Sequence, residues 1–327
     1  MFFSAPRYRG PASDHFDGRH FFNPLPGAQP RGFGGAIRWM ATRERGVWRR
    51  YREEGPGDPP PRRVADMRVT FVNHATVLIQ MAGRNVLTDP VWGERVSPVR
   101  RVGPRRVRPP GIRFEDLPQI DAVLVSHNHY DHMDLSTLGR LSRRDRPTLF
   151  SGLGNGRLLT SRGIASAVDL DWWESSEIGR GFSVTAVPVQ HFSGRGASDR
   201  NATLWTGFVV SGSSGDVFFA GDTGYGPHFA RIRERFPRLR LAVLPIGAYR
   251  PEWFMSPVHE NPAEAIRAQR DLGAATAVGM HFGTFELTDE GEDEPPREIE
   301  RLLRETPEPK PRFWVLKFGE GRDVPAI

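Results

Sequence analysis

The chain has 327 residues, 38% of them hydrophobic and 26% charged, a balance that excludes both a membrane-embedded bundle and a disordered chain. It contains no cysteine, so any metal must be held by histidine and carboxylate side chains. The formal net charge is +6, and Lys310 and Lys317 are the only lysines among 45 basic residues. Arginine binds phosphate through paired hydrogen bonds, which suggests an acidic partner, although a coding bias toward arginine is the simpler explanation.

Neither membrane insertion nor secretion is expected. No apolar run reaches the length of a transmembrane helix, and Met1–Pro11 is too short and too interrupted for a signal peptide. The sequence therefore predicts a cytoplasmic protein, with peripheral attachment to a membrane as an alternative.

Residues 1–63 differ from the rest of the chain and are predicted to form an N-terminal arm. Met1–Pro30 is rich in proline, glycine and aromatic residues and has no steady period, which is typical of an extended segment. From Gly35 to Glu53, apolar residues fall near one stripe and arginines cover the remainder, which predicts a basic amphipathic helix. Such a helix can lie on an anionic membrane or, as we favour, pack on the domain body. Gly55–Pro61 then links the arm to a domain over 64–327.

The domain over 64–327 mixes strands and helices. The predicted strands are Arg68–Val72, Thr76–Met81, Ala122–Ser126, Thr148–Ser151, Ser183–Val189, Thr203–Ser211, Asp216–Ala220, Leu241–Ile246, Thr276–Met280 and Arg312–Lys317. The predicted helices are Asp134–Ser142, Tyr225–Phe236, Pro262–Leu272 and Pro296–Glu305. Because the two types do not alternate regularly, a layered α/β sandwich fits better than a barrel or a Rossmann sheet.

The strongest chemical signal is the segment Ala122–Asp134, AVLVSHNHYDHMD. Directly after an apolar strand come four candidate metal donors, His127, His129, Asp131 and His132. Residues two apart in an extended chain point the same way, so the first two histidines can share one ion about 2 Å from each nitrogen. The turn toward the next helix then directs Asp131 and His132 to a second, adjacent position.

Three further donors each follow an apolar strand, namely His191, Asp222 and His281. Strand ends gather loops into a cleft, so we predict that these side chains join the first cluster. The full prediction is a pair of ions, with His127, His129 and His191 at the first, Asp131, His132 and His281 at the second, and Asp222 bridging. Ligation by nitrogen and oxygen alone favours zinc, with iron and manganese as alternatives.

Several other polar residues allow two interpretations. Asp89 either orients a ligating histidine from behind or begins a turn before Pro90. His74 is either a similar support or a packed core residue, and His259 is either structural or catalytic. The loop Arg95–Arg113, with seven arginines, either recruits anionic headgroups or pairs with local acids. The remaining histidines, His15, His20 and His228, have no evident partner.

The HxHxDH motif at His127–His132 resembles the signature of the metallo-β-lactamase superfamily. Longer blocks are similar to the N-acylphosphatidylethanolamine-hydrolysing phospholipase D family, namely DPVWGERVSP, IDAVLVSHNHYDHMD, DLDWWE, FFAGDTGYGPHF, LPIGAYRPEWFM and MHFGTFEL. They run from about Val69 to Phe285, and Phe22-Asn23-Pro24 resembles a motif of that family's arm.

The resemblance implies a four-layer αβ/βα sandwich, two zinc ions on the seven donors, and hydrolysis of a phospholipid on the headgroup side by a hydroxide that bridges the ions. It implies that Asp131 and Asp222 act in catalysis through the metal centre. His259 would stabilise charge on the phosphoryl oxygens or protonate the leaving group. Tyr130, Gln190 and His259 match positions near the site of that family, so the resemblance leads us to expect them to contact substrate.

Other functions are weighed against this one. The same centre could open a lactone or a β-lactam or cleave a nucleic acid phosphodiester, and a metal-binding protein without turnover is the alternative outside enzymes. No RNA- or DNA-binding motif is found, so no nucleic acid partner is expected. A homodimer is compatible with the sequence.

Overall fold

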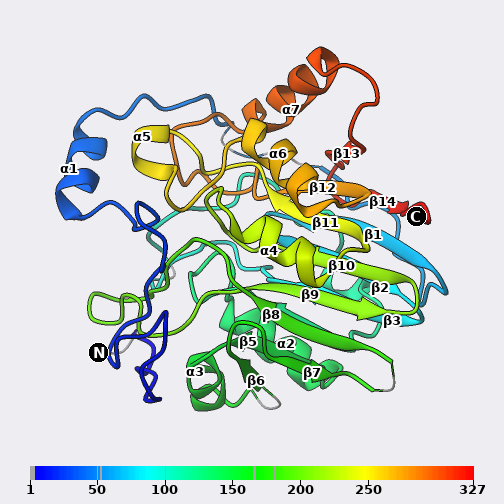
Figure 1. The fold of residues 1–327 in the computed structure, drawn as a ribbon, viewed down its shortest axis with the longest axis horizontal. Coiled ribbons are helices and arrows are strands. Elements are labelled where there is room, and N and C mark those ends of the chain that lie inside the picture. Colours follow the sequence, from blue (N-terminus) through cyan, green and yellow to red (C-terminus); the bar gives the residue numbers. More distant parts are fainter. Residues whose placement is uncertain (1–3, 50, 52–53, 100, 165–166, 180) are drawn as a thin grey trace.

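The computed structural model describes residues 4–49, 51, 54–99, 101–164, 167–179 and 181–327. Two seven-stranded mixed sheets pack face to face (Figure 1). The first sheet has the order β14 (Gly321–Asp323), β1 (Met67–Asn73), β2 (Thr76–Met81), β3 (Arg84–Thr88), β4 (Ala122–Val125), β5 (Thr148–Gly152), β6 (Ala167–Leu170). The second has the order β13 (Phe313–Trp314), β12 (Thr276–Met280), β11 (Leu239–Pro245), β10 (Gly215–Phe219), β9 (Gly207–Gly212), β8 (Ser183–Val187), β7 (Ser175–Glu177).

The helices are α1 (Phe33–Ala41), α2 (Leu135–Arg144), α3 (Asn155–Ser161), α4 (His228–Arg235), α5 (Glu252–Met255), α6 (Pro262–Leu272) and α7 (Glu294–Glu305), with a 3-10 turn at Phe114–Asp116. Helices α2, α3, α4 and α6 lie on the outer faces of the sheets, whereas α1 and α5 contact each other beside the sandwich (Figure 1). Side chains alternate across the strands: in β2, Val77 and Ile79 face the core between the sheets, whereas Leu78 faces the core beneath α2 and α3. Because both faces of the central strands are buried, strands such as β2, β4, β11 and β12 are apolar almost throughout, whereas the outer strands β7 and β14 are polar.

Most of the predicted elements are present, with differences at their ends. The strand predicted over Thr203–Ser211 begins only at Gly207. Six further elements are not predicted from the sequence, because they are short and have little apolar periodicity, namely β3, β6, β7, β14, α3 and α5. Among the described residues, no helix combines the length and the apolar character needed to cross a bilayer.

The arm departs most from expectation, because the helix predicted from Gly35 to Glu53 ends at Ala41. Residues 42–49, which we call the strap, run without helical structure beside residues 286–293. There the Gly46 amide donates to the Asp289 carbonyl at 2.6 Å, and Trp48 Nε1 donates to the Glu290 carbonyl at 2.8 Å. These tertiary hydrogen bonds replace helical ones. Residues 50 and 52–53 of the predicted helix lie outside the described residues.

The arm before α1 also packs on the body. Phe16 and Phe21 are buried in the core, and His15 Nε2 lies 2.8 Å from a carboxylate oxygen of Asp171. The expectation that His15 has no partner is therefore wrong.

Candidate metal centre

The candidate site forms where strands of both sheets end. In one sheet β3, β4 and β5 are parallel, and in the other β10, β11 and β12 are parallel, so their carboxyl ends meet at one edge of the sandwich. Gly221, two residues after β10, has φ +59°, and a Cβ there would lie 2.4 Å from Cβ of Ser126, the residue after β4. Only glycine allows this close approach, which brings Asp222 next to the histidines that follow Ser126.

The first group of donors consists of three imidazoles. His127 Nε2 lies 2.8 Å and His191 Nε2 3.3 Å from His129 Nδ1. Two donors about 2.0–2.1 Å from one tetrahedral zinc ion would lie about 3.3 Å apart, so this spacing suits a shared ion. The outward nitrogens are held by other groups: His127 Nδ1 contacts Ser126 Oγ at 2.9 Å, and His191 Nδ1 donates to the Val258 carbonyl at 3.0 Å. These contacts direct the Nε2 atoms inward.

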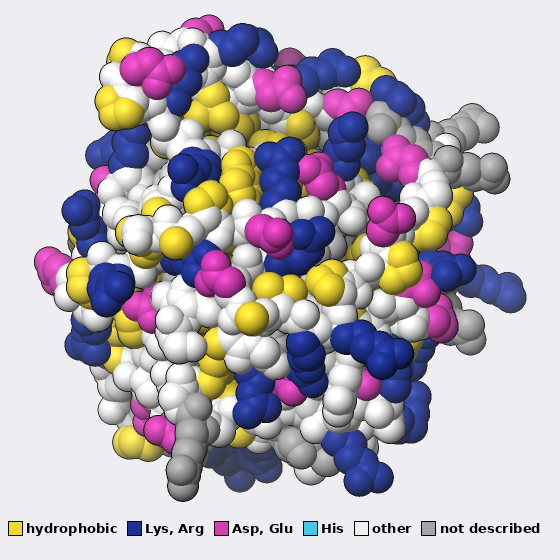
Figure 2. Space-filling model, turned by 90° about the vertical axis from the view of Figure 1, so that its right-hand side faces the viewer, with side chains coloured by type: hydrophobic (Ala, Val, Ile, Leu, Met, Phe, Trp, Pro, Cys, Tyr) yellow, Lys and Arg dark blue, Asp and Glu magenta, His cyan; other side chains and the backbone are white. Residues whose placement is uncertain are grey.

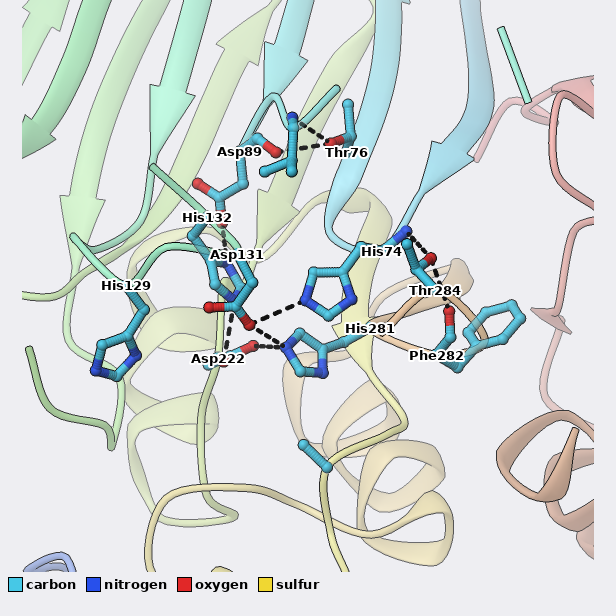
Figure 3. A network of polar contacts seen from close by, with 12 residues as sticks. His74, Thr76, Asp89, His129, Asp131, His132, Asp222, His281, Phe282 and Thr284 are labelled. Atoms are coloured by element: carbon cyan, nitrogen blue, oxygen red, sulfur yellow. Dashed lines mark hydrogen bonds and ion pairs between the residues drawn. The ribbon is translucent and has the colours of Figure 1, made fainter. Parts of the chain in front are cut away.

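The second group of donors surrounds Asp131 (Figure 3). Its Oδ2 lies 3.1 Å from His74 Nε2, 3.5 Å from His132 Nε2 and 3.6 Å from His281 Nε2. Behind His132, the Nδ1 atom contacts Asp89 Oδ2 at 2.6 Å. His132 therefore presents Nε2 to the same space that Asp131 and His281 face.

The Asp222 carboxylate lies between the two groups. Its Oδ2 is 3.1 Å from His132 Nε2, 3.7 Å from His191 Nε2 and 3.9 Å from His127 Nε2, whereas its Oδ1 is 3.3 Å from His281 Nε2. The structure thus brings together all seven donors singled out in the sequence.

The protonation states suit cation binding. Burial lowers the pKa of His127 and His191 well below the usual value and that of His129 to about 4, so these imidazoles are neutral near pH 7. Burial alone would raise the pKa of Asp131 and Asp222, but the adjacent histidines hold both well below the usual value. Three neutral imidazoles and two ionised carboxylates therefore line the site.

The carboxylates of the site stabilise the positively charged form of two further histidines, His132 and His281. Burial alone would lower the pKa of His132 and His281, but Asp222 and its neighbours raise that of His132 well above the usual value and that of His281 to about 9. His132 Nε2, His281 Nε2 and Asp222 Oδ1 are also buried without a hydrogen-bond partner among the described residues. A divalent cation would supply the charge and satisfy these atoms, so the residues fit a divalent metal site.

Asp89 and Ser126 support the ligands from behind. The Asp89 carboxylate accepts hydrogen bonds from the Ser126 amide at 2.7 Å and from its hydroxyl at 2.6 Å while contacting His132. This geometry favours the orienting interpretation of Asp89 over a simple turn, and the contact with Asp131 favours a supporting role for His74. Asp89 (φ 30°), His74 (φ 44°) and His281 (φ 64°) adopt strained backbone conformations, which persist where surrounding structure fixes them. The supporting role of Ser126 is not predicted from the sequence.

The predicted substrate contacts divide into two kinds. His259 lines the cavity above the donors, 5.0 Å from His191 between ring centroids. Tyr130 instead packs against Val91 and Phe285, with Arg195 3.9 Å from its ring centre, and lines a separate cavity. Gln190 turns away to donate to the Tyr225 carbonyl at 2.9 Å. Neither Tyr130 nor Gln190 is among the residues that line the main cavity, and their contact with substrate stays a prediction.

The cavity over the donors has a volume of about 610 Å³. Its floor carries His129, Asp131, His191, Asp222 and His281. Its walls are largely apolar and are formed by Phe33, Ala36 and Trp39 of α1, Phe254 and Met255 of α5, and Phe192, Val258 and Leu287. Arg31 and Arg200 are the basic residues that line the cavity. This wall is not predicted from the sequence, because α1, α5 and residues 287–288 meet only through tertiary packing.

Comparison with known proteins agrees with the fold. The β-lactamase superfamily domain matches residues 84–282. N-acyl-phosphatidylethanolamine-hydrolyzing phospholipase D 1 of Caenorhabditis elegans is 38% identical over 246 residues, which cover 72% of this chain and 69% of that protein. The mitochondrial N-acyl-phosphatidylethanolamine-hydrolyzing phospholipase D of Saccharomyces cerevisiae is 37% identical over 226 residues, 67% of this chain and 48% of that protein. The chain thus spans about half the length of the yeast relative.

A solved structure supports the architecture independently. An isothiocyanate hydrolase from Delia radicum gut bacteria matches with a TM-score of 0.62 at 19% identity, covering 80% of this chain and 100% of that chain. At this identity the likeness shows the fold alone, and it confirms the predicted αβ/βα sandwich. The chain belongs to the metallo-β-lactamase superfamily of metal-dependent hydrolases and, within it, to the N-acylphosphatidylethanolamine-hydrolysing phospholipase D-like family.

Proposed function

We propose that this protein is a zinc-dependent phosphodiesterase of the phospholipase D type that acts on N-acylphosphatidylethanolamine or similar phospholipids with two zinc ions on the seven donors. The observation that carries the proposal is a single cavity with a donor-lined floor and a largely apolar wall. An amphiphile fits this arrangement, because its phosphate can reach the floor while acyl chains stay against the wall.

Two arginines are available for the phosphate. Arg31 and Arg200 line the cavity, and the ion pairs among the described residues include neither of them. The Arg200 guanidinium lies 4.8 Å above the Phe192 ring, and burial lowers its pKa from the usual value. A phosphate oxygen would therefore meet an arginine whose charge no carboxylate neutralises.

The chain's own residues provide positioning and hydrogen bonds for the reaction. When bound, the two ions supply a water acidic enough to attack phosphorus near neutral pH and stabilise charge on the phosphoryl oxygens. Burial lowers the pKa of His259 to about 4, so its imidazole is neutral near pH 7. A neutral imidazole donates one hydrogen bond, which suits stabilisation of a phosphoryl oxygen better than protonation of the leaving group.

Replacing His259 with alanine is expected to lower kcat by about 10²-fold, the usual cost of removing one donor to a developing charge. Zinc content should stay unchanged, because His259 is not among the seven donors. Turnover of N-acylphosphatidylethanolamine with parallel elemental analysis measures both quantities. An unchanged kcat would exclude the hydrogen-bonding role.

The substrate assignment is tested with a panel of N-acylphosphatidylethanolamine, ordinary phospholipids, bis-p-nitrophenyl phosphate, a lactone and a β-lactam, all offered to the zinc-loaded protein. The expected product from the phospholipids is a phosphatidic acid. Opening of the lactone without phosphodiester cleavage would overturn the proposed function.

The protein also attaches to anionic membranes in this account. Apart from Ile327, the exposed large hydrophobic side chains come from the arm, the loop after β3 and α5, namely Phe33, Ile37, Met40, Val47, Tyr51, Val99, Val102 and Trp253. Arg38 lies 4.6 Å above the Trp253 ring, so basic and apolar groups alternate on α1 and α5, which lie side by side (Figure 1). On the face away from α1, basic, acidic and hydrophobic side chains are intermixed (Figure 2). The exposed apolar and basic side chains of α1 and α5, which lie beside the cavity, suit binding to an anionic lipid surface.

The double substitution Ile37→Ser and Met40→Ser tests this attachment. We expect about tenfold weaker binding to vesicles containing phosphatidylserine, since burial of two apolar side chains is lost. Hydrolysis of bis-p-nitrophenyl phosphate should not change, because neither residue lines the cavity. Ile327→Ser is the matched control at an exposed apolar position. Vesicle binding that survives the double substitution and is insensitive to salt would contradict the attachment.

A further inference from the structure

Helix α1 forms one wall of the cavity but has little packing of its own. Phe33, Ala36 and Trp39 line the cavity, yet no side chain of α1 is buried. Its contacts with α5 are a stack of Trp39 on Phe254, with ring centres 5.3 Å apart, and the Arg38 contact described above. Nine residues of helix with so little burial need a further restraint to keep a fixed position.

Asp289 supplies that restraint. Its Oδ2 accepts a hydrogen bond from Trp39 Nε1 at 2.8 Å, and its Oδ1 accepts one from Arg43 Nε at 2.8 Å. Its carbonyl accepts from the Gly46 amide, and Arg43 Nη2 donates to the neighbouring Thr288 carbonyl at 3.1 Å. Asp289 is only 4% exposed, so one buried carboxylate joins the helix and the strap.

Asp289 is itself fixed to the second sheet. Its amide donates to the Arg250 carbonyl at 3.1 Å, in the segment that follows β11. The adjacent Glu290 carboxylate accepts from the Ala248 amide at 2.6 Å, the Arg250 amide at 3.2 Å and Thr288 Oγ1 at 2.7 Å. A continuous set of hydrogen bonds therefore runs from the end of β11 to the cavity wall.

Another ion pair of the strap is more exposed. Arg45 Nη1 lies 3.3 Å from Glu286 Oε1, with side chains 62% and 34% exposed. Exposed ion pairs contribute little to stability. A buried carboxylate that accepts hydrogen bonds from an arginine and an indole, in contrast, fixes the positions of both donors. Among the acidic residues of 286–293, Asp289 is thus the one that is buried and also contacts α1.

We infer that Asp289 is a positioning residue that holds α1 against the cavity, and that α1 thereby determines how long an acyl chain the cavity accepts. The inference rests on the proposed function for its substrate class. Without Asp289 the α1 wall loses its anchor, so the apolar contacts made by the distal part of an acyl chain are lost, while the donor floor is unaffected.

The experiment compares wild type, Asp289→Ala, Asp289→Asn and the matched control Glu286→Ala, all zinc-loaded. For Asp289→Ala we expect KM to rise at least about tenfold for a long-chain phospholipid and less than about twofold for a phospholipid with six-carbon acyl chains. The value of kcat should not change, because the lost contacts bind the substrate and its transition state equally. Asp289→Asn keeps an acceptor for Trp39 and should recover part of the loss, and Glu286→Ala should match wild type. Equal rises in KM for both chain lengths, or a fall in kcat alone, would overturn the inference.

A second measurement does not depend on turnover. Tryptic cleavage after Arg43, Arg45 or Arg49 and binding of a fluorescent long-chain fatty acid are followed in the metal-free protein. Asp289→Ala should cleave faster in the strap and bind the probe more weakly, whereas Glu286→Ala should do neither. If these effects appear but no phospholipid is hydrolysed, the proposed function fails and the positioning role stands; if cleavage and probe binding equal wild type, the positioning role fails.

Discussion

Replacing Asp222 with alanine is expected to lower phosphodiesterase activity by at least about 10³-fold, because a carboxylate that lies between both donor groups is lost. The Asp222 side chain lies within 3.7 Å of His132, His191 and His281 and therefore contacts donors of both groups. Metal content should fall in parallel, as measured by elemental analysis after dialysis.

A matched control is Asp216→Asn, since Asp216 lies in the same strand, β10, away from the donors. It should retain both zinc and activity. If Asp222→Ala kept wild-type activity and zinc, the assignment of the donor set would be wrong. If it lost activity but kept all its zinc, Asp222 would act on the substrate and not as a ligand.

Replacing Asp89 with alanine is expected to weaken zinc binding by about 10- to 100-fold, the usual cost of removing a partner that orients a ligand. The substitution frees His132 Nδ1 and the Ser126 hydroxyl, which Asp89 now contacts at 2.6 Å each. Zinc titration of the metal-free variant, followed by activity, measures the affinity.

Saturating zinc should restore much of the activity of Asp89→Ala, because Asp89 does not line the cavity. Asp89→Asn keeps an acceptor and should weaken binding less. If the zinc affinity of Asp89→Ala is unchanged, Asp89 does not orient a ligand and only begins the turn before Pro90.

The metal donors could be predicted from the sequence because their signal is local. Four of them lie within His127–His132, and His191, Asp222 and His281 each follow an apolar strand, so strand ends alone place them at one edge. Periodicity likewise predicts strands such as β2 and β12 and helix α6 to the residue.

The cavity could not be predicted in the same way. Its wall joins α1 to α5 through Trp39 and Phe254, about 200 residues apart, and neither side chain carries a motif. The strap was expected to be helical because its residues have helical periodicity, yet its tertiary bonds to residues 286–293 decide its conformation. Tyr130 and Gln190 lie next to ligands in the chain, but their side chains point elsewhere, which sequence adjacency cannot reveal.

The most direct test is a zinc titration of the metal-free protein with hydrolysis of N-acylphosphatidylethanolamine as the readout. Our account requires activity to rise until two equivalents of zinc are bound per chain and then to level off. A plateau at one equivalent, or a fully loaded protein that cleaves no phosphodiester, would contradict it.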